Sequence, residues 1–270
     1  MLSELFSYAF IVRALIVGTL VALCAALLGV SLVLKRYSMI GDGLSHVGFG
    51  ALSVALALNV APLEVSLPVV AFAAFLLLRL SERSVIKGDA AIALVSSSAI
   101  AIGVIVVSMT TGMNIDVYNY MFGSILAMSG SDVILSIGVS VVVLTLYLLF
   151  YNKIFAVTFD ESFAKATGIK SGRYNMLIAL LTALVIVVGM RMMGAMLISS
   201  LIIFPALTAM RLLHSFKSVV ICAAILSVVC FVVGIAISFV WSVPVGASIV
   251  VVNLAAFLIF SSLKAAIRRV

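Results

Sequence analysis

Long apolar runs alternate with short polar segments along the whole chain, and this pattern restricts the possible folds more than any other feature. A membrane-spanning helix needs about 20 mostly apolar residues. Nine stretches approach or reach that length, although some are short enough that eight spans and a half-helix is an alternative. The nine stretches are 8–34, 40–58, 63–80, 90–110, 132–152, 174–190, 194–211, 219–240 and 246–263.

The composition supports the same class of protein. Hydrophobic residues make up 66% of the chain and charged residues 9%, whereas a soluble domain is about half apolar and a quarter charged. A soluble core could not hide so much apolar surface, and helices satisfy their own backbone groups in lipid. The sequence therefore predicts an all-α polytopic membrane protein, with residues 1–270 forming a single transmembrane domain.

The basic residues gather in alternate polar segments, which predicts an orientation. With the N-terminus outside, 14 of the 16 Lys and Arg residues lie on the inner side, and only Arg13 and Arg191 do not. Cytoplasmic loops carry such an excess of cations, so the net charge of +7 reflects topology and not nucleic-acid binding. The inner cations are Lys35, Arg36, Arg79, Arg83, Lys87, Lys153, Lys165, Lys170, Arg173, Arg211, Lys217, Lys264, Arg268 and Arg269.

One polar motif interrupts the apolar pattern near the start of the second stretch. Residues 35–50 read KRYSMIGDGLSHVGFG, with Asp42 and His46 four positions apart. Residues at this spacing share a helix face, and ionisable groups at membrane depth are costly and usually functional. A carboxylate and an imidazole together suit zinc, manganese or iron(II). The alternative is structural: Asp42 as a helix N-cap and His46 as a core histidine bonded to a carbonyl.

The longest polar interruption, residues 155–174, lies on the inner side by the charge pattern. Asp160 and Glu161 suit the start of a short helix and Gly168 suits its end, which predicts an amphipathic helix over about 159–167. The chain contains no Gly-Lys dipeptide and therefore no phosphate-binding loop of the G-x-x-x-x-G-K-[ST] type. Any ATP hydrolysis belongs to a separate chain, for which this helix is either a docking element or an ordinary surface helix.

Two further segments carry polar residues. Pro205 lies within 194–211 near Ser199, Ser200 and Thr208, which predicts either a hinge that lines a pathway or a static kink. The outer segment 111–132 is too polar to span a membrane and predicts a short interfacial or re-entrant helix. Its carboxylates, Asp116 and Asp132, are expected to be solvated loop residues.

Three of these segments, in this order, resemble the membrane subunits of zinc/manganese-type ABC importers. They are LLGVSLVLKRYSMIGDGLSHVGFG, FDESFAKATGI and GAMLISSLIIFPALTA. The resemblance covers nearly the whole chain and is clearest over residues 15–211. It implies a type II ABC importer permease-like fold of eight to nine helices, in the plasma membrane of a prokaryote.

The resemblance also implies partners and residue roles. A homodimer would enclose a path for a divalent metal ion, which is the transported substrate, and no permanently bound cofactor is expected. A cytoplasmic ABC ATPase would bind on one side, and an extracytoplasmic metal-binding protein would deliver the ion on the other. The metal path would involve Asp42 and His46, and coupling to the ATPase would involve Asp160, Glu161, Ala164 and Gly168.

Other functions remain open at the level of sequence. The chain has two histidines and no histidine-rich loop, so the choice among zinc, manganese and iron is open. A permease for a metal chelate such as a siderophore or cobalamin would have related architecture, with a wide path lacking paired ligands. An ion-coupled secondary transporter or a non-transporting subunit of a membrane complex are alternatives of other classes.

Overall fold

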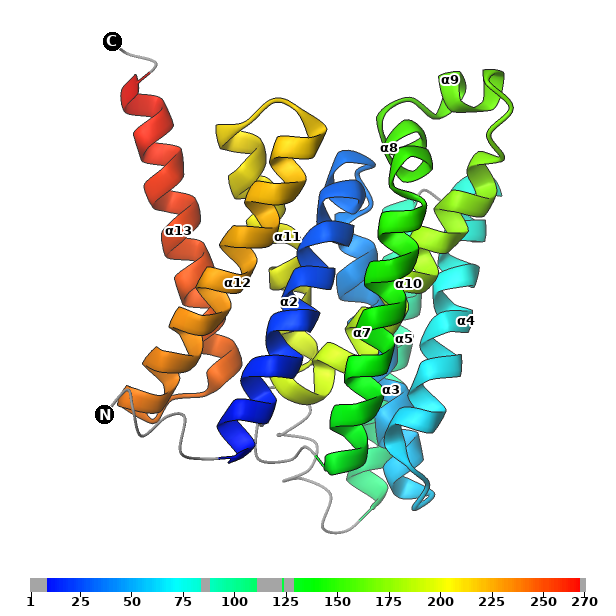
Figure 1. Cartoon of the computed structure of the whole chain (residues 1–270). Coiled ribbons are helices and arrows are strands. Elements are labelled where there is room, and N and C mark those ends of the chain that lie inside the picture. The colour runs from blue at the N-terminus through cyan, green and yellow to red at the C-terminus, as the bar shows by residue number, and fades with distance from the viewer. Residues whose placement is uncertain (1–8, 84–87, 111–122, 124–128, 268–270) are drawn as a thin grey trace.

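The computed structural model describes residues 9–83, 88–110, 123 and 129–267, and within these residues all regular structure is helical. The helices form one bundle (Figure 1). In chain order they are α2 (Ala9–Leu34), α3 (Ser38–Ala57), α4 (Pro62–Arg83), α5 (Gly88–Met109), α7 (Gly130–Leu149), α8 (Tyr151–Phe159), α9 (Glu161–Ala166), α10 (Ser171–Met193), α11 (Ala195–Leu212), α12 (Phe216–Trp241) and α13 (Val245–Ile267).

The predicted all-helical membrane fold is confirmed. Among the described helices, α2, α3, α4, α5, α7, α10, α12 and α13 are long and apolar enough to cross a membrane. The ninth predicted stretch is α11, whose apolar part, Leu197–Leu212, is shorter than the others. Each predicted stretch thus corresponds to one helix, and the alternative of eight full spans with one shorter helix also describes the structure.

Helix α3 is closely packed because small residues let its neighbours approach. It packs against α4, α5, α10 and α11. A Cβ added at Gly43 would lie 2.7 Å from the Ile92 side chain, and one added at Gly50 would lie 2.7 Å from the Ala99 carbonyl oxygen of α5. The glycines of residues 35–50 therefore allow close contact between α3 and α5.

The polar segments assigned to the inner side lie together at one end of the bundle. Helices α8 and α9, the α2–α3 turn and the α11–α12 turn all lie at the end where the chain finishes, opposite the N-terminal end (Figure 1). The α2–α3 turn carries Lys35 and Arg36, and the connection from α9 to α10 carries Lys170. This clustering agrees with the orientation predicted from the cations.

At the opposite end, the expectation for Asp132 is wrong. Asp132 is the third residue of α7, and its carboxylate accepts a hydrogen bond from the Ser129 N–H at 3.0 Å. The Ser129 hydroxyl accepts in return from the Asp132 N–H at 3.2 Å, so the two residues form a capping box and Asp132 is buried. The predicted interfacial or re-entrant helix, including Asp116, lies outside the described residues apart from Gly123.

We expect Gly50→Ala to lower the thermal unfolding midpoint of the detergent-solubilised protein. The added methyl group would press on the α5 backbone, and overpacking of this kind costs about 1–3 kcal/mol. Gly138→Ala is the control, since a Cβ there meets no atom within 4 Å. Equal unfolding midpoints for the two variants would contradict the packing argument.

Candidate functional site

Asp42 lies inside α3 and does not cap it. The helix begins at Ser38, and its N-cap residue is Tyr37, which makes no side-chain capping hydrogen bond. Asp42 is therefore one turn into the helix, where its carboxylate has no role in satisfying the first N–H groups. The N-cap interpretation of Asp42 is wrong.

Asp42 and His46 lie on the one open face of the inner half of α3. The Asp42 side chain is 37% exposed and that of His46 21%, whereas Gly43, Leu44 and Ser45 between them are buried. The Ser199 side chain of α11 interacts with the Asp42 carboxylate. Two helices that are distant in sequence therefore contribute polar groups to the same place.

The separation of the two groups suits shared coordination of an ion. His46 Nε2 lies 3.5 Å from Asp42 Oδ2, which is long for a hydrogen bond. Two donors that each lie about 2.1 Å from a tetrahedral ion are about 3.4 Å apart. The separation of the two atoms is therefore compatible with both groups binding one divalent transition-metal ion from the same side.

One protomer supplies only part of a coordination shell. Within the described residues, no group of three or more His, Cys, Asp or Glu side chains could hold an ion. A transition metal usually takes four or more ligands. Water, hydroxyls such as that of Ser199 and groups of another chain are potential further ligands.

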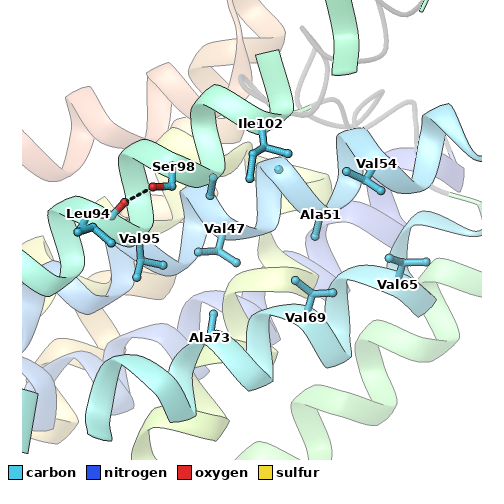
Figure 2. Close-up of a pocket in the computed structure, with 12 residues that line it drawn as sticks. Val47, Ala51, Val54, Val65, Val69, Ala73, Leu94, Val95, Ser98 and Ile102 are labelled. Carbon is cyan, nitrogen blue, oxygen red and sulfur yellow. Dashed lines mark hydrogen bonds between the residues drawn. The ribbon is translucent and has the colours of Figure 1, made fainter. Parts of the chain in front are cut away.

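A second face of α3 borders a cavity of about 400 Å³ between α3, α4 and α5. Its wall is apolar, with Val47, Val54, Val69 and Ile102 among the lining side chains (Figure 2). The one hydroxyl in the wall, that of Ser98, already donates to the Leu94 carbonyl at 2.7 Å. The cavity offers no ligand set for a cation and is separate from the Asp42–His46 face.

Helix α11 continues through Pro205, which is buried. The neighbouring hydroxyls bond elsewhere: Thr208 donates to the Phe204 carbonyl at 2.8 Å and Ser200 to the Leu197 carbonyl at 2.6 Å. The backbone break instead comes before the helix, at Gly194, whose φ of 90° suits glycine. A hinge at Pro205 stays a prediction, and the break at Gly194 is a feature that the sequence analysis missed.

The predicted inner helix is present, and its ends are built as expected. Asp160 is the N-cap of α9, where its carboxylate accepts from the Phe163 N–H at 2.9 Å. Gly168 follows the helix with a φ of 83°, and the Ile169 N–H reaches back to the Ala164 carbonyl at 2.9 Å, in the manner of a glycine C-terminal cap. Ala164 is buried, so it packs α9 against the bundle.

Two aromatic side chains near α9 face away from the bundle. Phe163 is 63% exposed and Phe159, the last residue of α8, is 74% exposed. The sequence did not indicate α8 itself, because its residues continue the apolar α7 and then enter the polar segment. Exposed aromatic residues beyond the membrane-spanning helices are typical of a surface that a partner covers.

Glu161 turns toward the bundle. Its carboxylate accepts from Lys165 at 2.9 Å, from Lys35 at 3.3 Å, from Ser171 at 3.2 Å and from Asn175 at 3.3 Å. Partial burial raises the pKa of Glu161, but the hydrogen bonds from Lys165 and Asn175 and the charge of Lys35 outweigh it and lower the pKa to about 2. The stabilisation from this carboxylate is therefore complete above its ordinary pKa of 4.5 and is lost as the pH falls through about 2.

The bundle of spanning helices, the partly exposed Asp42–His46 pair within it and the short helix α9 at one end match the architecture of a membrane transport subunit. The sequence model of the ABC 3 transport family matches residues 7–264. The chain therefore belongs to this family, and it is a multi-pass permease subunit of a prokaryotic plasma membrane.

Named relatives span almost the same length. The high-affinity zinc uptake system membrane protein ZnuB of Haemophilus influenzae is 30% identical over 251 residues, covering 93% of this chain and 95% of that protein. The manganese transport system membrane protein MntC of Halalkalibacterium halodurans is 29% identical, covering 92% and 85%. A structure of PsaBC from Streptococcus pneumoniae in complex with a Fab matches with a TM-score of 0.86 at 30% identity, covering 96% of this chain and 95% of that one.

We expect Asp160→Ala to loosen α9, because an N-cap contributes about 1 kcal/mol to its helix. Amide hydrogen exchange within Glu161–Ala166 should become faster, while exchange in α3 stays unchanged. Asp160→Asn is the control, since asparagine caps about as well as aspartate. Faster exchange in Asp160→Asn than in Asp160→Ala would contradict the capping role.

Proposed function

We propose that this chain is the permease subunit of an ATP-driven importer that passes zinc, manganese or iron(II) from an extracytoplasmic metal-binding protein to the cytoplasm. The observation that carries the proposal is the Asp42–His46 pair, with its 3.5 Å separation on an open face of a central helix. The names of ZnuB and MntC, which specify zinc uptake and manganese transport, favour the same class of substrate.

A homodimer would complete the site. One chain offers one carboxylate and one imidazole on the open face of α3, and two copies facing each other would offer two of each. Four such donors match the coordination number of many transition-metal sites. A transport site must also release its ion, and a shell assembled from two chains weakens as soon as the chains separate.

The inner end of the bundle is proposed to dock the ATPase. Helix α9 is short and capped at both ends; it carries the exposed Phe163, and the exposed Phe159 lies just before it at the end of α8. Such a helix suits the helix-in-groove mode of recognition. Asp160, Ala164 and Gly168 fix the shape and position of the helix, and the aromatic rings supply the contact surface.

Asp42→Ala and His46→Ala should each lower metal uptake about tenfold or more, since loss of even an outer partner of a metal ligand commonly costs 10–100-fold in affinity. The measurement is uptake of radioactive Zn²⁺ or Mn²⁺ into proteoliposomes that contain the permease, its ATPase and the binding protein.

The matched controls change the same residue types away from the pair. Asp89 lies in the first turn of α5, and His214 is exposed beyond the end of α11. Asp89→Asn and His214→Ala should transport at close to the unmodified rate. Uptake at the unmodified rate in both Asp42→Ala and His46→Ala would exclude the pair as pathway ligands.

Phe163→Asp should lower the affinity for the ATPase by at least about tenfold, because a central aromatic contact often contributes more than 2 kcal/mol to an interface. Phe163→Leu keeps an apolar side chain and should retain most of the binding. Affinity is measured by titrating the ATPase onto the detergent-solubilised permease. Unchanged binding by Phe163→Asp would place the docking surface elsewhere.

A further inference from the structure

A buried lysine at the end of α2 connects three other helices. The Lys35 side chain is 8% exposed, and its ammonium group donates three hydrogen bonds. The acceptors are the Val157 carbonyl of α8 at 3.1 Å, Glu161 Oε2 of α9 at 3.3 Å and Asn175 Oδ1 of α10 at 2.5 Å. We call these four residues the Lys35 cluster.

Side chains of this chain take up most of the hydrogen-bonding capacity of Glu161. Oε2 accepts from both Lys35 and the Asn175 side-chain amide. Oε1 accepts from Ser171 and from Lys165, whose side chain is 62% exposed. The Glu161 carboxylate is thus bound by side chains of its own chain. Its contribution to coupling is therefore through its bond with Lys35, and not through direct contact with a partner protein.

Lys35 is also attached firmly to the helix that carries the ligand pair. The α2–α3 turn is short and closed by backbone bonds from Tyr37 N–H to the Leu32 carbonyl at 2.8 Å and from Ile40 N–H to the Tyr37 carbonyl at 3.0 Å. Arg36 within it adopts a φ of 61°, an unusual conformation for a residue with a Cβ. Asp42 follows seven positions after Lys35, so a displacement of Lys35 shifts the inner end of α3.

We propose that Lys35 is a positioning residue that transmits movement of α9 to α3, and so lets the ATPase bound at α9 control the Asp42–His46 site. The inference rests on the proposed function, because it assumes an ATPase at α9 and a metal at α3. A buried ion pair is a weak source of net stability. Its three donated bonds do fix the relative positions of α2, α8, α9 and α10.

The test compares uptake per ATP hydrolysed in proteoliposomes containing the permease, its ATPase and the binding protein. Lys35→Met should bind the ATPase and hydrolyse ATP, yet take up about tenfold less metal per ATP, within the range of usual coupling energies. Lys35→Arg should restore most of the coupling. Lys165→Met, which removes the exposed partner of the same carboxylate, should stay within about twofold of the unmodified ratio.

A double variant separates transmission from charge compensation. If Lys35 only neutralises Glu161, then Lys35→Met combined with Glu161→Gln should regain the unmodified uptake per ATP, and that result would overturn the proposal. If Lys35 transmits movement, the double variant stays uncoupled. If Lys35→Met fails to fold, Asn175→Ala provides a second test. It removes the shortest hydrogen bond of the Lys35 cluster and keeps the Lys35–Glu161 ion pair. It should also lower uptake per ATP.

Failure of the inference and failure of the proposed function give different results. No ATP-dependent uptake of zinc, manganese or iron(II) by the unmodified protein would remove the proposed function and the inference with it. Normal uptake by the unmodified protein, with an unchanged ratio in both Lys35→Met and Asn175→Ala, would remove the inference alone.

Discussion

Hydrocarbon offers no hydrogen-bond partners, so a polar group left unsatisfied within a spanning helix is costly. Hydroxyls within the spanning helices mostly bond to a carbonyl of their own helix, as Ser45 does to Gly41, Ser53 to Phe49 and Thr182 to Ile178. Charged groups are treated differently: Lys35 and Glu161 meet at the inner end of the bundle, where several donors and acceptors converge. Asp42 and His46 differ from this pair, since they lie partly exposed on one face of a spanning helix. Ionisable groups within a span are costly and usually functional.

The fold could be predicted from the sequence because the apolar requirement repeats in every span. Each of the nine stretches corresponds to one helix, and the glycines of the α3 motif do allow close approach to α5. Helix α8 was missed because its residues continue the apolar pattern of α7, and no polar segment separates the two helices in the sequence. Asp132 was misplaced for a related reason: a capping box uses the residue types of a solvated loop, and only the backbone geometry distinguishes the two.

The site was only partly predictable. Spacing alone put Asp42 and His46 on one face, but it could not exclude an N-cap, because helix starts are uncertain by a few residues. The start at Ser38 settled that question. The Lys35 cluster could not be predicted from the sequence for another reason. Lys35 bonds to residues 122, 126 and 140 positions away in the sequence. Local sequence periodicity does not indicate which lysine of a polar segment will be buried against other helices.

The way α3 is held suggests where a displacement would act. On the α5 side, backbone meets backbone, since a Cβ at Gly50 would reach the Ala99 carbonyl, and such close packing resists separation. On the α11 side, contact at Asp42 is made through the Ser199 side chain, which can change rotamer at little cost. A shift of the α3 inner end is therefore more easily taken up at the Asp42–Ser199 contact than at the α5 interface. The Asp42–His46 pair thus lies beside a contact of α3 that is made through a side chain, whereas the α3–α5 contact at Gly50 is made through the backbone.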